Sequence, residues 1–592
     1  MSPSSTPLSR FIGALDIEFS PTHFFDPDAA ASANTGTFAN PFVTVPAIQA
    51  YIDSSNGGQA MRLGLKRGTI FRGAFALQGI SGSDDLPVFI GPYGDSLALP
   101  QVVGGMIKSD WVAVDGQAGM YQGIPAVSGG TSKETELYES GIRYIRIPQQ
   151  GSLALAQSAL LAAGAGHAAF FGGIHYIIPV DKPNLGQIEY ASEDAAFSIT
   201  LRDAADCGHL YIMGLHARLS RNFAFGVYPL GSAAGRTGTN IVIEACAAGQ
   251  AGVDTTNPPD GNSGSMAAFS LGGSYMSAAN RMTQITVRSN FAYQAINNAL
   301  ELLAVDGALV EMNQAREING CSIVECFAAC SNVVARYNRG YGDINAWSRA
   351  VNSAASSNSY QKAGFWQSSL TLDGAGGTAI DAGGTANANN VYAFNYVEDA
   401  PAYYAHVQGG SCKIHHNTFV RRHHTGGESF LRNDNGAPGG ANACEFSNNL
   451  CVDMAYSTSQ SMLYVDLYSN SVFPKGDRNI YSGPYSGSFF YDGSANGFLF
   501  TNYRAQPAVA AAPLDQTSYA NRQYFPGAAG TGAIYHRQAQ VDTLGRPTQG
   551  SIANGNGTTS AAVFNRDSRV DYSRDIEGKP MSLSAPTIGC YA

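Results

Sequence analysis

Apolar and polar residues alternate in short runs through the second half of this chain. The runs are four to six residues long, are rich in Val, Ile, Tyr, Phe and Cys, and are separated by Gly and Asn. Short runs of such residues between turn residues predict β-strands. Six runs end in an asparagine that follows an apolar residue by three positions: Asn290 after Val287, Asn313 after Val310, Asn338 after Ala335, Asn395 after Tyr392, Asn417 after Ile414 and Asn449 after Phe446.

The spacing of these asparagines predicts a solenoid. The gaps are 23, 25, 57, 22 and 32 residues, so that 57 reads as two coils with an insertion and 32 as one coil with a loop. The period is too short for paired-helix repeats. We therefore expect a parallel β-helix with coils about 4.8 Å apart. Each Asn is expected to turn inward, bond the equivalent amide of the next coil, and adopt the left-handed backbone of a corner.

Composition supports a long β structure. Charged residues make up only 14% of the 592, and 68 are Gly, which favours many tight turns over disorder. The net charge of −10 and the absence of a Lys/Arg-rich run argue against nucleic acid as a partner. No stretch of about 20 apolar residues predicts membrane insertion. The Ala- and Leu-rich segment Leu153–Phe171 is expected to form a helix or a covering segment.

The nine cysteines form no CxxC pair, and Cys321, Cys326 and Cys330 lack zinc-site spacing. They are expected to be reduced core residues, which favours synthesis in a reducing compartment.

The N-terminus shows no export signal. The pairs His415-His416 and His423-His424 should point to opposite faces of a strand, and the loop Asp254–Asp260 lacks calcium-ligand spacing. We predict no metal and no cofactor.

Several motifs resemble one family. The opening Phe24-Phe25-Asp26, the step Asn40-Pro-Phe-Val-Thr and the strand-like run that begins at Val88 (Val-Phe-Ile-Gly-Pro-Tyr-Gly) are similar to the first coils of pectate-lyase-like right-handed β-helices, with a capping helix at Val45–Ser54. The end, from Asp575 (Asp-Ile-Glu-Gly-Lys-Pro), resembles their closing segment. The resemblance implies an all-β, right-handed, single-stranded parallel β-helix. We expect a lead-in at 1–22, the helix at 23–470 and a less regular C-terminal region at 471–592. Loop insertions are expected at Gly249–Gly264, Ala346–Lys362, Gly374–Asn389 and Gly426–Asn442.

Within that superfamily the chain looks most like a bacteriophage tailspike. The missing export signal, the cysteines and the long Gly/Ser/Asn-rich helix carry this resemblance. It implies a homotrimer made in the host cytoplasm, attached to a phage baseplate or tail in the virion, and acting at the bacterial cell surface. Its partner would be a bacterial surface polysaccharide, an O-antigen or a capsule, cleaved at internal glycosidic bonds.

Two surface columns follow from the repeat. Two residues before the six ladder Asn lie Arg288, Glu311, Arg336, Ala393, His415 and Ser447, and strand alternation points this column outward. This column is either a surface ion-pair ladder or a cationic strip for an acidic sugar. Eleven or twelve residues after four of these Asn lie Glu301, Glu325, His406 and Glu428, with Trp366 on the intervening coil. Apolar neighbours again predict an outward face.

The second column suggests glycoside hydrolysis. Carboxylates one coil apart are about 5 Å apart, which raises the pKa of one and matches the retaining geometry. A separation of about 6.5–9.5 Å, reached by skipping a coil or crossing columns, would favour inversion. We predict Glu301 and Glu325 as the catalytic pair, with Glu311 and Asp306 as further candidates. Substrate would be bound by the cationic and aromatic residues nearby: Arg336, His406, Trp366, Tyr404 and Arg288.

Three alternatives stay open. A polysaccharide lyase would use Arg336, His406 and Tyr404 for β-elimination from a uronate. A non-catalytic adhesin would bind glycan with the same face. An exported pectin- or alginate-type lyase whose signal is missing from this sequence would also fit.

Overall fold

A computed structural model provides the structure of the chain. It describes residues 19–30, 34–127, 135–147, 150–202, 207–229, 238–252, 267–272, 281–295, 298–318, 322–342, 363–367, 388–400, 403–407, 411–422, 429–433, 444–454, 463–467, 476–483, 490–491, 497–498, 519–522, 541–542, 546–549, 551, 553–557, 559 and 566–592.

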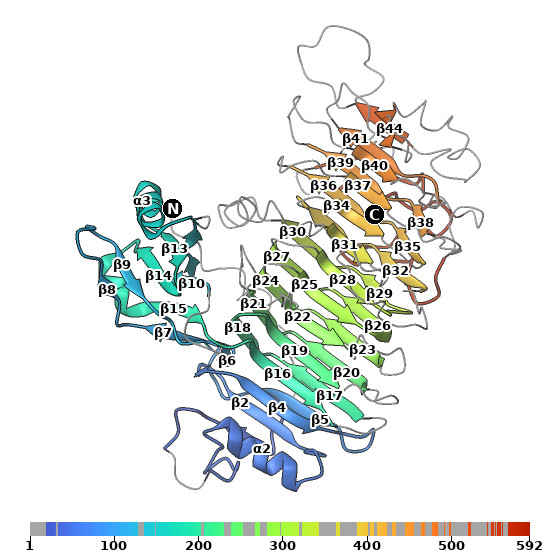
Figure 1. The fold of residues 1–592 in the computed structure, drawn as a ribbon. Coiled ribbons are helices and arrows are strands. Elements are labelled where there is room, and N and C mark those ends of the chain that lie inside the picture. The colour runs from blue at the N-terminus through green and yellow to red at the C-terminus, as the bar shows by residue number, and fades with distance from the viewer. Residues whose placement is uncertain are drawn as a thin grey trace, which may run out of the picture.

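Three long sheets run side by side along the molecule (Figure 1). The chain passes through sheets A, B and C in turn and then returns to A one coil further on, so strands of successive coils pair in parallel. This winding confirms the parallel β-helix predicted from the asparagine spacing.

The strands of each sheet follow in stacking order. Sheet A contains β1 His23–Phe25, β2 Arg62–Lys66, β5 Val88–Tyr93, β17 Cys207–Met213, β20 Gly238–Glu244, β23 Met282–Arg288, β26 Val305–Glu311, β29 Val334–Arg336, β32 Asn390–Ala393, β35 Cys412–His415 and β38 Cys444–Ser447. Sheet B contains β3 Ile70–Arg72, β6 Gln101–Val103, β18 His216–Ser220, β21 Ala247–Ala251, β24 Phe291–Ala295, β27 Gln314–Ile318, β30 Arg339–Gly342, β33 Tyr396–Glu398, β36 Thr418–Arg421, β39 Leu450–Asp453, β41 Ile480–Gly483 and β44 Tyr519–Arg522. Sheet C contains β4 Phe75–Ile80, β16 Ala195–Leu201, β19 Phe223–Pro229, β22 Ala267–Gly272, β25 Asn298–Leu303, β28 Ser322–Ala328, β31 Ala363–Gln367, β34 Tyr403–Val407, β37 Ser429–Asn433, β40 Leu463–Leu467, β42 Phe490–Tyr491 and β43 Gly497–Phe498.

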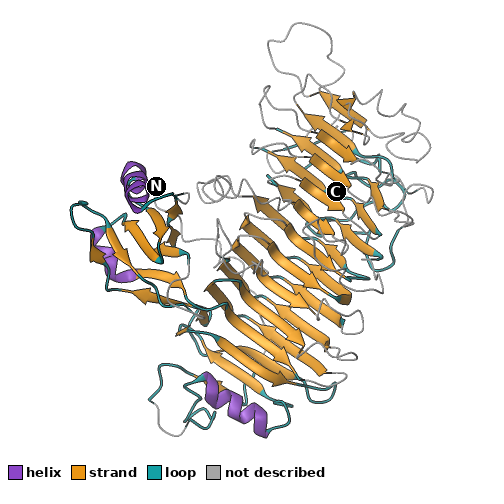
Figure 2. Cartoon of the chain, in the orientation of Figure 1, coloured by secondary structure: helices purple, strands orange, loops and turns teal. Residues whose placement is uncertain are grey.

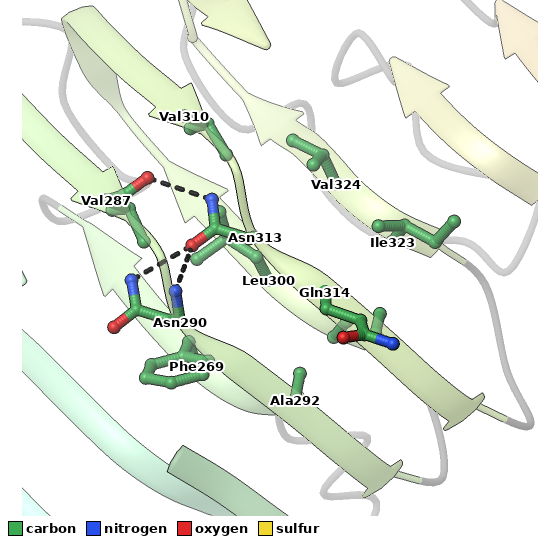
Figure 3. A pocket seen from close by; sticks show the side chains of 12 residues that line it. Phe269, Val287, Asn290, Ala292, Leu300, Val310, Asn313, Gln314, Ile323 and Val324 are labelled. Carbon is green, nitrogen blue, oxygen red and sulfur yellow. Dashed lines mark hydrogen bonds between the residues drawn. The ribbon is translucent and has the colours of Figure 1, made fainter. Parts of the chain in front are cut away.

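The asparagine ladder marks the corner between sheets A and B. The Nδ2 group of Asn290 donates to Oδ1 of Asn313 at 3.0 Å, and Asn313 Nδ2 also donates to the Val287 carbonyl at 2.9 Å (Figure 3). The same side-chain bond joins each later pair, and Asn479 adds a seventh rung that the sequence pattern missed. The stacked amides satisfy each other where strand pairing stops, as predicted.

One detail of the ladder prediction is wrong. The left-handed backbone belongs to the residue before each Asn, and these residues have φ between 54° and 60°: Ser289, Met312, Tyr337, Phe394, His416, Asn448 and Arg478. The turn is therefore made one position earlier, which leaves the Asn free to point inward.

The core is built from stacked equivalent side chains. Phe75, Phe197, Phe225 and Phe269 on successive coils of sheet C have ring centroids 5.4, 4.6 and 5.4 Å apart. Beyond them, the interior space beside Leu300 and the ladder is only about 10 Å³ (Figure 3). Such a space holds at most about one water molecule, so the inside of the helix is packed core.

A helix closes the N-terminal end of the stack. Helix α2, Val45–Ser54, begins with a proline in its first turn and buries Val45, Ile48 and Ile52 against the first coil (Figure 1). A solenoid needs such a cap because its end coil would otherwise expose core. The capping helix predicted at these residues is confirmed.

A separate unit replaces the connection between β6 and β16 (Figure 2). The described residues between 105 and 191 form two small sheets whose pairing is mostly antiparallel, and this unit was not predicted. Its elements are β7 Gly105–Lys108, β8 Val112–Ala113, β9 Tyr121–Gly123, β10 Leu137–Glu139, β11 Ile142–Arg143, β12 Ile145–Arg146, α3 Leu153–Ala163, β13 His167–Phe171, β14 Ile174–Ile178, the 3-10 helix η1 Lys182–Gln187 and β15 Ile188–Ala191. The helix expected within Leu153–Phe171 is α3, and β13 completes that segment.

The C-terminal segment 566–592 folds back along the outside of the helix. Val570, Tyr572 and Tyr591 pack on outward side chains of sheets A and B, including Phe394 and Tyr396.

The cysteines that the structure describes are free and buried, as expected: Cys207, Cys246, Cys326, Cys330, Cys412, Cys451 and Cys590. In the described part of the chain, no helix has the length and apolar content needed to cross a bilayer.

Candidate functional site

The sheet-A column is an ion-pair ladder. Arg288, Glu311 and Arg336 lie in register on adjacent coils, as predicted. Arg336 bonds Glu311 at 2.9 Å and its Nη1 donates to the Arg569 carbonyl at 3.0 Å, while Arg288 bonds Glu244 at 2.8 Å. The C-terminal segment therefore lies where a sugar was expected to contact Arg336. Of the two interpretations, the contacts favour the ion-pair ladder, and Glu311 is engaged in it.

The sheet-C column has the predicted register. Glu301 pairs with Glu325, Glu325 with Trp366, and Trp366 with His406. The flanking Leu300, Leu302, Val324 and Cys326 belong to the core, so the two glutamates lie on the opposite side of the sheet, as alternation requires.

The expected exposure of this column is wrong. Glu301 is 5% exposed, Glu325 1% and His406 1%. Ser270 Oγ donates to Glu301 at 2.9 Å, and Asn298 Nδ2 donates to Glu325 Oε2, whereas Glu325 Oε1 has no hydrogen-bond partner among the described residues. Burial, and then the charge of Glu301, raise the pKa of Glu325 well above its usual value. Glu325 is thus a buried acid in register with a second buried glutamate.

Other predicted residues lie elsewhere. Tyr404 is in the core, where its ring packs between Phe419 and Phe430 and its hydroxyl donates to the Val420 carbonyl, so it offers no face to a sugar. Asp306 is the second residue of β26 on sheet A and accepts a hydrogen bond from Asn332 at 2.7 Å. The backbone of Trp366 is in β31, but its side chain lies outside the described residues.

An open cleft lies between sheet B and the inserted unit. It has a volume of about 520 Å³ and is lined mainly by polar side chains from both parts: Arg72, Gln101, Ile107, Ser140, Gly141, Gln187, Glu189, His216, Arg218, Gln250 and Tyr293. Concave sites with a few convergent polar groups are where ligands usually bind. This cleft is therefore the candidate functional site that the structure adds.

Two arginines share one carboxylate in this cleft. Arg218 binds both oxygens of Glu189, at 2.9 and 3.0 Å, and Arg72 binds the same carboxylate at 2.8 Å. Burial would raise the pKa of Glu189, but the bonds and charges of Arg218 and Arg72 outweigh it and lower that pKa. One positive charge is left over, which favours an anionic ligand.

A histidine and a tyrosine face each other beside these arginines. The Nε2 atom of His216 and the Oη atom of Tyr293 are 2.8 Å apart. Burial and the charge of Arg218 lower the pKa of His216 to about 3, and burial raises the pKa of Tyr293. Near neutral pH the imidazole is therefore unprotonated and the phenol keeps its proton.

Gly249 makes this pair possible. It lies in register between Arg218 and Tyr293, and a Cβ added there would be 2.4 Å from the Tyr293 carbonyl oxygen and 2.5 Å from the Tyr293 ring. Without that Cβ the ring leans across β21 and reaches the histidine two coils away. Phe291 stacks against Tyr293 with centroids 5.7 Å apart and holds it in place.

Sequence reasoning missed the cleft because its parts come from distant segments. Glu189 belongs to the inserted unit, and Arg72, His216 and Tyr293 belong to three different coils. The coil of His216 precedes the first ladder Asn, so the Asn spacing could not assign the register of that coil. The sequence Gly-Leu-His-Ala-Arg at 214–218, a polar-apolar-polar alternation that places His216 and Arg218 on one face, is a signal that could have indicated this surface. Among the described residues, no three metal-ligating side chains gather as a metal site.

No family model and no curated protein matches the chain. Solved structures do match. A GH136 lacto-N-biosidase from Eubacterium ramulus is 12% identical with a TM-score of 0.46, over 84% of this chain and 67% of that one. Pectate lyase Pel9A is 13% identical with a TM-score of 0.40, over 97% of both chains. An alginate lyase from Paenibacillus is 11% identical with a TM-score of 0.32, over 62% and 91%. These names describe glycan-degrading enzymes, hydrolases and lyases alike. The β-helix assignment rests on the strand pairing of this chain and not on these scores.

Proposed function

We propose that this protein is a polysaccharide depolymerase that binds an acidic glycan in the cleft between sheet B and the inserted unit. The observation that carries the proposal is the His216–Tyr293 pair beside an arginine pair that has one charge in excess. A uronate carboxylate would compensate that charge. This favours β-elimination over the paired-carboxylate hydrolysis expected from the sequence.

The pair has the protonation states that elimination requires. His216 is unprotonated and takes the proton on the carbon next to the carboxylate, while Tyr293 donates its proton to the leaving glycosidic oxygen. A carbon–hydrogen and a carbon–oxygen bond break, and a carbon–carbon double bond forms. The negative charge of a bound uronate raises the pKa of His216 toward the working range. Because the two groups are 2.8 Å apart, the proton can return from the imidazole to the phenolate after each turnover.

Hydrolysis by Glu301 and Glu325 is a second candidate function. Its support is their register on adjacent coils and the raised pKa of Glu325, which fit a general acid beside a carboxylate nucleophile. Their burial stands against it, since substrate has to reach both groups.

One experiment separates the two. Purified protein is mixed with uronate-containing polymers and bacterial capsules, and both the ultraviolet band of unsaturated uronate and new reducing ends are followed. Elimination raises both signals, and hydrolysis raises reducing ends alone. Under elimination, Tyr293→Phe loses about 100-fold or more in rate and still binds glycan, whereas Tyr211→Phe, on sheet A beside Asn240, keeps the wild-type rate. Loss in Glu325→Gln without loss in Tyr293→Phe would refute the cleft and support hydrolysis.

The biological setting is proposed from the sequence resemblance. In that setting the protein is a trimeric phage tailspike, and the glycan is an O-antigen or capsule on the bacterial surface. Sedimentation of the full chain tests the trimer. Binding that never shortens a glycan would support the adhesin alternative.

A further inference from the structure

An outward column of sheet B continues from the cleft along the helix. Arg218 pairs with Gly249, Gly249 with Tyr293, Tyr293 with Arg316, and Arg316 with Tyr341. We call Arg218, Tyr293, Arg316 and Tyr341 the sheet-B strip. Coils about 4.8 Å apart place Arg316 about 14 Å beyond Arg218.

The far half of this strip has the composition of a sugar-acid site. Arg316 is exposed, and its guanidinium carbon lies 4.9 Å from the centroid of the Tyr341 ring. When the side-chain amide of Gln314 is turned so that its oxygen faces Arg316, that oxygen accepts hydrogen bonds from Nε and Nη2 of Arg316 at 2.8 and 3.0 Å. The stacking and these bonds fix the guanidinium plane, and no salt bridge neutralises it among the described residues. Arginines held in this way bind carboxylates well.

The charged residues of other outward columns are paired in salt bridges, whereas Arg316 of the sheet-B strip has none among the described residues. On sheet A, Arg288 and Arg336 both have carboxylate partners. On sheet B itself, Glu398 one coil beyond Tyr341 is paired with Arg422 at 2.9 Å. The strip ends there, where Tyr591 of the C-terminal segment packs edge-on against Tyr396.

We propose that Arg316 and Tyr341 form a second subsite for an acidic sugar, so that one glycan chain runs from the cleft along the sheet-B strip. This rests on the proposed function, which places the reacting sugar in the cleft. The subsite binds a carboxylate with Arg316 and the apolar face of a sugar with Tyr341. It makes the protein select long acidic chains over short ones, because only a long chain reaches both places.

Binding of the full chain to defined polymers tests the subsite. The probes are polygalacturonate, alginate and hyaluronan, with dextran as the neutral polymer, and Kd is measured by calorimetry. On the acidic polymer that wild type binds, Arg316→Gln is expected to raise Kd about tenfold, and Tyr341→Ala to raise it as well. Arg574→Gln, which removes an exposed arginine of the C-terminal segment, stays within about twofold. A disaccharide of the same polymer binds wild type and Arg316→Gln equally.

Three results would overturn the subsite. They are a wild-type Kd in Arg316→Gln, an equal loss in Arg574→Gln, and wild-type binding to dextran but to none of the acidic polymers. Failure of the proposed function is seen separately, as wild type that binds an acidic polymer without cleaving it. Cleavage that needs Tyr293 but is indifferent to Arg316 keeps the cleft and refutes the subsite alone.

Discussion

Replacing Glu325 by glutamine should stabilise this protein, and more so as the pH rises. Glu325 is 1% exposed, and burial together with Glu301 raises its pKa well above the usual value. An unfolded chain releases that proton near pH 4.3. Above that pH, and up to the folded pKa, the folded state therefore binds one proton more than the unfolded state. The free energy of unfolding then falls by about 1.4 kcal/mol for each pH unit.

Glutamine removes this dependence because it has no proton to lose. Its amide keeps the shape of the side chain, and its oxygen can accept the bond that Asn298 donates to Glu325. Over two pH units inside this window, the variant should gain about 2.7 kcal/mol on wild type.

The assay is the melting temperature of both proteins from pH 5 to pH 8. The difference, variant minus wild type, should grow with pH. Glu317→Gln, at a half-buried glutamate of sheet B bonded by Gln294, is the matched control for the chemical change. A difference that is negative and constant over the whole range would show that Glu325 is ionised in the folded protein and would refute the reasoning.

Three further predictions follow from the ladder, the cleft and the corner under the C-terminal segment. Asn313→Ala removes bonds to both neighbouring rungs and should cost about 3 kcal/mol or more in chemical denaturation, whereas Ala at exposed Asn332 should cost far less. Gly249→Ala should displace the Tyr293 ring and lower the cleavage rate at least tenfold; an unchanged rate would contradict the role of the pair. Burial lowers the pKa of His415 to about 3, so wild type should lose stability as pH falls from about 6.5 toward 3, and His415→Gln should show a shallower fall in melting temperature between pH 6 and pH 4.

The sequence alone determined the fold and much of its register. A repeated Asn with an apolar residue three positions earlier fixes the coil, because an inward amide and an inward apolar side chain each need an equivalent partner one coil away. Hence Arg288, Glu311 and Arg336 stack as predicted, and so do Glu301, Glu325 and the backbone positions of Trp366 and His406. The capping helix was placed correctly from the resemblance to the first coils of pectate-lyase-like β-helices, and the structure shows that a proline lies in its first turn and that it buries an apolar face.

Only the tertiary structure decided which of these columns is open to a ligand. Alternation gives the side of the sheet on which a residue lies, but it does not say what packs on that side. Glu325 lies opposite the core and is buried all the same, and Arg336 is contacted by the carbonyl of Arg569, more than 200 residues later in the chain. The cleft is the opposite case, because it is open to a ligand and was not predicted from the sequence. Sheet B places His216 beside Tyr293 across two coils, but only the docking of the inserted unit adds Glu189 and closes the cleft, because such a site depends on contacts that no local repeat encodes.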